Sequence, residues 1–203
     1  MQLVMNEMAP ITRDDFFNNP AHQPVMDAWQ GAVLATGFEE LANGNVTVRL
    51  SSHEQFPDFQ VKHGSVVHDF EAVMALNKPL GKLYKGDMEK GPVSLGKPEV
   101  MPPPDLGPMR EAIEGKVKKQ YAGVVNLCVY LNYASGGAEF EKVVSEVLDA
   151  AQGKFKSIWI IARGSTAGEA DQGGFFLCCA KVAAGLPRTG AWYRIQRLKG
   201  GKP

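Results

Sequence analysis

Three carboxylates of this 203-residue chain are predicted to share one face of a β-hairpin. We expect His63-Gly64 to form the tight turn, because glycine readily adopts the positive φ that such a turn needs. Counting back from this turn places Asp58 opposite Asp69. Because side chains alternate along a strand, both then lie on the same face as Glu71.

This acidic face predicts a magnesium site. Opposed like charges destabilise a sheet unless they are solvated, protonated or bound to a hard cation. Mg²⁺ commonly takes one or two carboxylates together with water and phosphate oxygens. We therefore expect Asp58, Asp69 and Glu71 to be the metal ligands; the alternative is a sheet edge that simply faces water.

A cation is expected next to these acids. The spacing predicts a helix over 109–121, with Ile113 and Val117 on its buried stripe and Lys116, Gln120 and Tyr121 at the margins. The ammonium of Lys116 is then able to reach the acidic face. The alternative is a solvated amphipathic helix whose basic side has no special role.

The elements that must position these groups begin with a helix and three short strands. An irregular lead-in at 1–23 precedes them, and a segment rich in proline and glycine at 77–108 follows them. The expected helix spans 24–42, and the expected strands span 46–50, 56–62 and 66–73.

The second half of the chain predicts a parallel βαβ unit. Nearly continuous apolar runs at 124–133 and 157–162 are typical of strands buried on both faces, and an amphipathic helix at 139–152 connects them. Further strands are expected at 175–182 and 191–198. The whole chain is therefore predicted to be a single α/β domain, 1–203, with a mixed central sheet flanked by helices.

This order of elements, αβββαβ over 25–162, resembles the PD-(D/E)XK nuclease superfamily, whose core is the restriction-endonuclease-like fold. The resemblance also rests on Pro57-Asp58, followed thirteen residues later by Glu71 in Asp-Phe-Glu-Ala-Val. It implies that Asp58 and Glu71 hold Mg²⁺ for the hydrolysis of nucleic-acid phosphodiesters.

One position departs from the family pattern. The family places a catalytic lysine two residues after the second acid, but this chain has Val73 there. Some members of the superfamily move that group to the following helix, so Lys116 and Gln120 are the candidate catalytic residues. Members also recruit an acid from the first helix, for which Glu39 and Glu40 are the candidates.

The charge distribution suggests a nucleic-acid partner. Residues 1–60 carry eight acids and two bases, whereas 172–203 carry six bases and no acid. Such a basic C-terminal segment is able to bind phosphates, with Trp192 and Tyr193 as candidate stacking residues or core residues. The alternative is a basic tail that stays solvated or folds back on the acidic N-terminal part.

Other features limit the class of protein. No apolar run is long enough to cross a membrane, and no secretory signal is apparent at the N-terminus. The odd number of cysteines, all in apolar runs, predicts reduced thiols and a cytoplasmic protein; a homo-oligomer is left open. Three functions remain: a Mg²⁺-dependent nuclease, a non-catalytic binding or assembly protein on a degenerate nuclease-like fold, and a small-ligand domain using the loop Gly164–Gly168.

Overall fold

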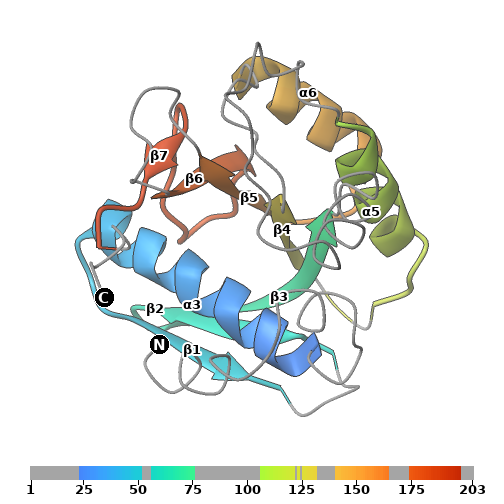
Figure 1. Ribbon diagram of the computed structural model, residues 1–203. Helices are drawn as coiled ribbons and strands as arrows, with labels where there is room; N and C mark the ends of the chain where they lie inside the picture. Colours follow the sequence, from blue (N-terminus) through green and yellow to red (C-terminus); the bar gives the residue numbers. More distant parts are fainter. Residues whose placement is uncertain are drawn as a thin grey trace, which may run out of the picture.

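A computed structural model describes residues 23–51, 56–75, 106–121, 123, 125–131, 140–164 and 174–197. Within these ranges the chain forms a curled seven-stranded sheet with three helices packed on it (Figure 1). The predicted α/β class with a mixed sheet flanked by helices is confirmed. Residues 1–22 of the predicted lead-in and most of the segment at 77–108 lie outside the described residues.

The sheet follows the order of the chain, β1 to β7. The first three strands form an antiparallel meander, β3, β4 and β5 run parallel, and β5, β6 and β7 are antiparallel. The predicted parallel βαβ unit is confirmed as β4, α6 and β5. The strands are β1 (Val46–Leu50), β2 (Phe59–His63), β3 (Val66–Ala75), β4 (Asn126–Leu131), β5 (Ile158–Gly164), β6 (Gly174–Lys181) and β7 (Tyr193–Arg194).

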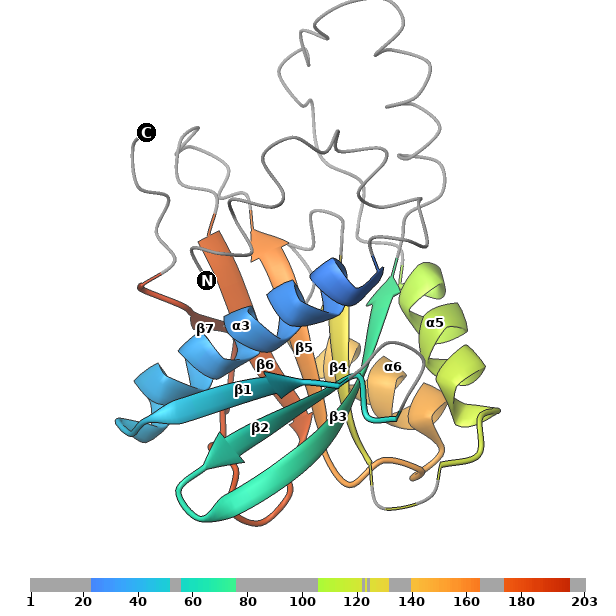
Figure 2. The same cartoon turned by 90° about the horizontal axis from the view of Figure 1, so that it is seen from below.

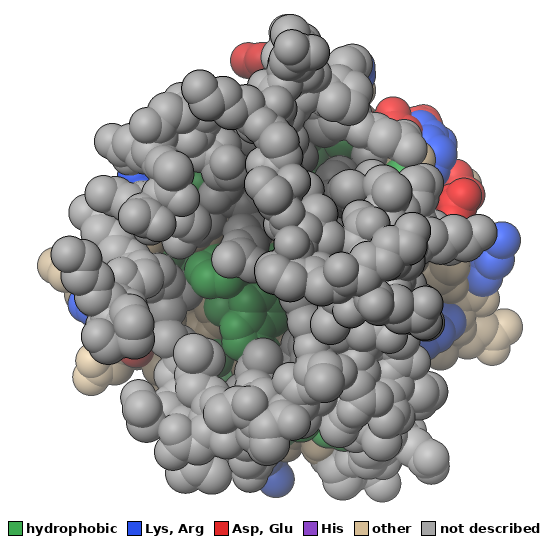
Figure 3. Space-filling model, viewed as in Figure 1, with side chains coloured by type: hydrophobic (Ala, Val, Ile, Leu, Met, Phe, Trp, Pro, Cys, Tyr) green, Lys and Arg blue, Asp and Glu red, His purple; other side chains and the backbone are tan. Residues whose placement is uncertain are grey.

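The helices cover the two faces of the sheet separately. Helix α3 (Gln23–Ala42) lies on one side, whereas α5 (Gly107–Val117) and α6 (Phe140–Ala151) lie on the other (Figure 2). Under α3, the aromatic rings of Phe38 and Trp159 pack edge to face with centroids 4.5 Å apart. Charged side chains gather over α5 and α6 (Figure 3), where Arg110 of α5 contacts Glu146 of α6 at 2.5 Å.

Strand β3 changes partner half-way along its length. Residues 66–70 pair with β2, and residues 70–75 pair with β4. Its side chains alternate between the two cores, so that Phe70 and Ala72 face α3 while Val73 and Ala75 face α5 and α6. Glu71 is therefore the first residue beyond the β2 pairing, on the face that α5 covers.

Candidate functional site

The hairpin keeps the predicted acidic face but not the predicted register. The turn lies at 64–65 and not at His63-Gly64, so Gln60, not Asp58, pairs with Asp69. The two registers differ by two residues, which leaves every side chain on its predicted face. Continuing the observed register by one step brings Asp58, directly before β2, opposite Glu71.

The backbone at the partner switch explains the orientation of Asp58. Beyond Phe70, β2 no longer supplies carbonyl groups to β3. The backbone N–H of Ala72 donates instead to Asp58 Oδ2, at 2.7 Å. This bond satisfies a backbone donor that would otherwise lack a partner, and it points the carboxylate toward Glu71.

Lys116 of α5 joins the two carboxylates. Its Nζ lies 3.3 Å from Asp58 Oδ2 and 2.6 Å from Glu71 Oε2. The side chain of Glu71 is only 6% exposed, that of Lys116 13% and that of Asp58 25%. Burial by itself lowers the pKa of Lys116, but the two carboxylates outweigh it and hold this pKa above its usual 10.5. The cluster of Asp58, Glu71 and Lys116 is called the acid–lysine cluster below.

Tyr121 is a member of the site that the sequence analysis did not identify. Its hydroxyl lies 3.1 Å from the carbonyl of Lys116 and 3.4 Å from Glu71 Oε2, so it is placed to donate to either oxygen. The ring packs against Phe56 and Phe155. Burial and the charge of Glu71 raise the pKa of the Tyr121 hydroxyl, so it remains a neutral donor.

Lys154 fixes the segment that carries Tyr121. Its Nζ donates to the carbonyl of Val117 at 2.6 Å and also to that of Lys119, and it lies 5.5 Å from the centroid of the Tyr121 ring. A cation at the C-terminus of a helix is favourable because the last carbonyls carry partial negative charge. Lys154 therefore anchors the end of α5 beside the acid–lysine cluster.

The first helix contributes Asp27, not Glu39 or Glu40. Asp27 is 8% exposed, and its Oδ1 accepts a hydrogen bond of 2.7 Å from Gln23. Burial, followed by the charge of Asp58, raises the pKa of Asp27 to about 6. Asp27 is thus an acid within electrostatic reach of the cluster.

The expected first-helix acids serve the C-terminal segment. Glu40 accepts from the hydroxyl of Tyr193 at 2.9 Å and from the backbone N–H groups of Gln196 and Arg197. Glu39 forms an ion pair with Arg197 at 2.9 Å. At these positions the basic segment folds back on acids of the N-terminal part, which is the alternative that the charge distribution had left open.

Two other predicted site residues lie apart from the cluster. Gln120 was expected on the helix over 109–121, but α5 ends at Val117, and Gln120 is an exposed residue beyond it with no hydrogen bond to the cluster among the described residues. Asp69 is on the predicted face, but its Oδ1 accepts from Gln60 at 2.8 Å. No group of three or more His, Cys, Asp or Glu side chains within the described ranges is arranged to hold a metal ion.

The remaining candidates have structural explanations where they are described. His68 is buried on the face opposite the acids, as expected, and Cys128 and Cys178 are buried free thiols. The loop Gly164–Gly168 lies outside the described residues beyond its first residue. No helix in the described part of the chain combines the length and the apolar character needed to span a membrane.

Comparison with known proteins identifies no relative: no family model, curated protein or solved structure matches the chain. The functional argument therefore rests on the geometry of the site.

Proposed function

We propose that this protein is a divergent PD-(D/E)XK-like, Mg²⁺-dependent nuclease whose catalytic lysine has moved to the following helix. The observation that carries the proposal is the position of Lys116, whose Nζ lies 2.6 Å from Glu71 and 3.3 Å from Asp58. Val73, which occupies the usual lysine position, instead packs into the core under α5 and α6. The ammonium of Lys116, supplied by α5, would take the place of the lysine that the family has at the position of Val73.

The residues of the site fit a hard divalent cation. Asp58 Oδ2 and Glu71 Oε2 both contact one nitrogen, so they are no farther apart than those two contact distances combined. Two neighbouring carboxylates, completed by water and substrate oxygens, are the donor set that Mg²⁺ commonly uses. When bound there, Mg²⁺ would lower the pKa of water and neutralise phosphate charge.

The protein groups have separate roles in this proposal. Asp58 and Glu71 would hold the cation. The ammonium of Lys116 would donate to a phosphate oxygen and stabilise the negative charge that grows in the transition state. Tyr121 would orient Glu71 through its hydroxyl, and Asp27 would add negative charge from the α3 side.

A non-catalytic binding or assembly protein is the second candidate. Two observations favour it: Val73 at the usual lysine position, and the ion pairs that Lys116 forms with both acids. In such a protein the acid–lysine cluster would only stabilise the packing of α5 on β3.

Cleavage assays with matched variants test the proposal. Plasmid and single-stranded substrates are incubated with Mg²⁺, Mn²⁺ or EDTA. We expect metal-dependent cleavage by the wild type and a loss of about 10²–10³-fold in Asp58→Asn, Glu71→Gln and Lys116→Met. Thermal melting of each variant must show that the fold is retained.

Two exposed residues of α6 provide controls of the same chemical type. Glu141→Gln and Lys142→Met remove one acid and one lysine from the surface of that helix. Both variants should cleave like the wild type. A wild type that is inactive with every metal and substrate, or cluster variants that are as active as these controls, would contradict the proposed nuclease.

A further inference from the structure

The ammonium of Lys116 contacts the same two oxygens that the acid–lysine cluster would offer to a divalent cation. Its Nζ lies 2.6 Å from Glu71 Oε2 and 3.3 Å from Asp58 Oδ2. Mg²⁺ takes carboxylate oxygens as its protein ligands. An ammonium and a divalent cation on one pair of carboxylates repel each other, because both are positively charged. The two cations would therefore compete for this pair of acids.

The hydrogen bonds of Asp58 show which contact has to change. A carboxylate has about two lone pairs on each oxygen. Asp58 Oδ2 accepts from the backbone N–H of Ala72 at 2.7 Å and from Lys116 Nζ at 3.3 Å. The N–H of Ala72 is fixed in β3, whereas the ammonium is carried on a flexible stem. A further ligand on Oδ2 therefore requires the ammonium to leave.

The end of α5 can stay in place while this ammonium moves. The carbonyl of Lys116 accepts from the backbone N–H of Lys119 at 3.1 Å, and the hydroxyl of Tyr121 lies 3.1 Å from the same oxygen. Lys154 donates to the carbonyls of Val117 and Lys119. All of these contacts hold backbone groups of the segment, so the side-chain torsions of Lys116 can change without unwinding the helix.

We propose that Lys116 is an internal competitor for the metal: its ammonium holds Asp58 and Glu71 together until a divalent cation displaces it toward the substrate phosphate. This inference rests on the proposed function and adds the regulation of the same site. Without the metal, the ammonium offsets the charge of two largely buried acids. Once displaced, it is available to a phosphate oxygen, so the site would gain its catalytic ammonium only when it holds the metal.

Metal affinity measured without nucleic acid tests the competition separately from cleavage. Binding of Mn²⁺ is followed by electron paramagnetic resonance, in which the signal of the free ion falls as the protein takes it up. We expect Lys116→Met to bind Mn²⁺ about 5- to 150-fold more tightly than the wild type, the usual range for two coupled binding events. Lys116→Gln, which removes the same charge, should behave alike. Mn²⁺ should also raise the Tm of both variants more than that of the wild type.

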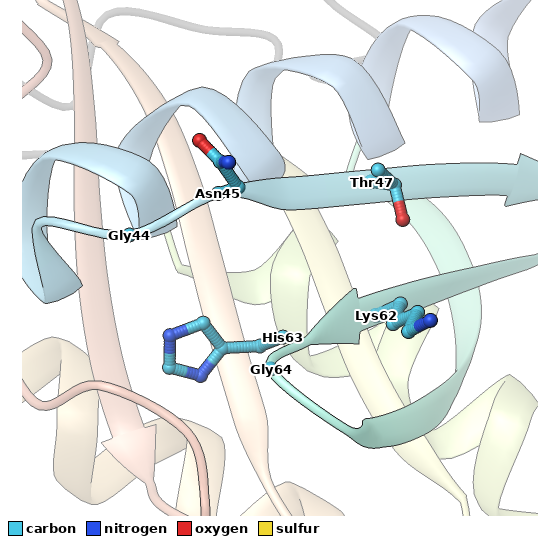
Figure 4. A pocket seen from close by; sticks show the side chains of 6 residues that line it. All are labelled: Gly44, Asn45, Thr47, Lys62, His63 and Gly64. Atoms are coloured by element: carbon cyan, nitrogen blue, oxygen red, sulfur yellow. The ribbon is translucent and has the colours of Figure 1, made fainter.

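Two exposed lysines provide matched controls. Lys118 lies two residues beyond Lys116, and Lys62 lies on β2, beside a hollow at the hairpin turn (Figure 4). Alternation places Lys62 on the same face of β2 as Asp58. Among the described residues, neither of these lysines contacts Asp58 or Glu71. Lys118→Met and Lys62→Met should bind Mn²⁺ within about twofold of the wild type, because salt screens exposed charges.

A measurement on the wild type does not depend on any variant. Reductive methylation with formaldehyde and cyanoborohydride, read by mass spectrometry, reports how accessible each lysine is. The side chain of Lys116 is 13% exposed. It should be methylated faster in saturating Mg²⁺ than in EDTA, whereas Lys62 and Lys118 should react at the same rate in both.

The outcomes separate this inference from the proposed function. Equal or weaker Mn²⁺ binding by Lys116→Met would overturn the inference even if the wild type cleaves nucleic acid, and so would a methylation rate of Lys116 that Mg²⁺ leaves unchanged. Tighter binding by Lys116→Met in a protein that never cleaves would refute the proposed function alone. If neither the wild type nor Lys116→Met binds Mn²⁺, both proposals are wrong.

Discussion

Replacing Asp27 by Asn should make the protein more stable at neutral pH. Asp27 is a buried residue of α3, and burial together with the charge of Asp58 raises its pKa to about 6. In the unfolded chain its pKa is near 3.8. The folded state therefore binds this proton more tightly than the unfolded state does, and the free energy of unfolding must fall as pH rises between about 4 and 6.

The size of the effect follows from the shift. A rise from 3.8 to about 6 corresponds to about 3 kcal/mol of lost stability once Asp27 is ionised in both states. Asn keeps the oxygen that accepts from Gln23 and carries no charge. Because its own amide must also be desolvated, we expect Asp27→Asn to gain about 1–3 kcal/mol at pH 7–8 and almost nothing near pH 3.5.

Urea unfolding of both proteins, followed by tryptophan fluorescence at half-unit steps from pH 3.5 to 8, measures this difference directly. Glu141→Gln, a substitution of an exposed acid on α6, should match the wild type throughout. A wild type that is more stable than Asp27→Asn at pH 8, or a difference that is the same at pH 4 and pH 8, would refute the reasoning. An NMR titration of the Asp27 carboxyl should give a midpoint near 6.

Substitutions at four other positions test the packing of the helices on the sheet by urea or thermal unfolding. Gly37→Ala should lose about 1–3 kcal/mol, because a Cβ there would lie 2.7 Å from Leu177 Cδ2. Gly115→Ala, which meets no atom within 4 Å on α5, should instead gain about 0.5–1 kcal/mol; equal effects would contradict the packing argument. Lys116→Met should lose about 2–4 kcal/mol because it leaves two neighbouring acids without their cation, and a neutral result would show that these ion pairs do not hold α5 on β3. Lys154→Met should lose roughly 1 kcal/mol by removing the cation at the end of α5, whereas Lys154→Arg should keep most of that stability.

The elements were predictable where the pattern of apolar residues is local and strong. The buried runs that became β4 and β5, and the amphipathic helix between them, have the expected parallel arrangement. The acidic face of the hairpin was predicted correctly because side chains alternate along a strand. A register shift of two residues leaves each side chain on the same face. The turn itself was misplaced by one residue, because both His63-Gly64 and Gly64-Ser65 offer a glycine.

The site was predictable only in part, because its members come from distant segments. Lys116 was identified as a candidate because it borders the buried stripe of the predicted helix. Tyr121 lies beyond the end of α5, and only the tertiary contacts with Phe56 and Phe155 place its hydroxyl at Glu71. Asp27 did carry a signal: it precedes Leu34 by seven residues and Phe38 by eleven, so it shares their buried stripe.

The balance of charge around the cluster bears on the choice between the two functions. Among the described residues, the charges of two acids, Asp58 and Glu71, and of one ammonium, that of Lys116, act on the third acid, Asp27. A protein that used the cluster only to fix α5 on β3 would need one acid, and it would be more stable with Asn at position 27. A divalent cation at Asp58 and Glu71 would offset the excess negative charge and reduce the repulsion from Asp58, which after burial is the second cause of the raised pKa of Asp27. The proposed metal-dependent nuclease would therefore account for the buried third acid, whereas the proposed assembly protein would not.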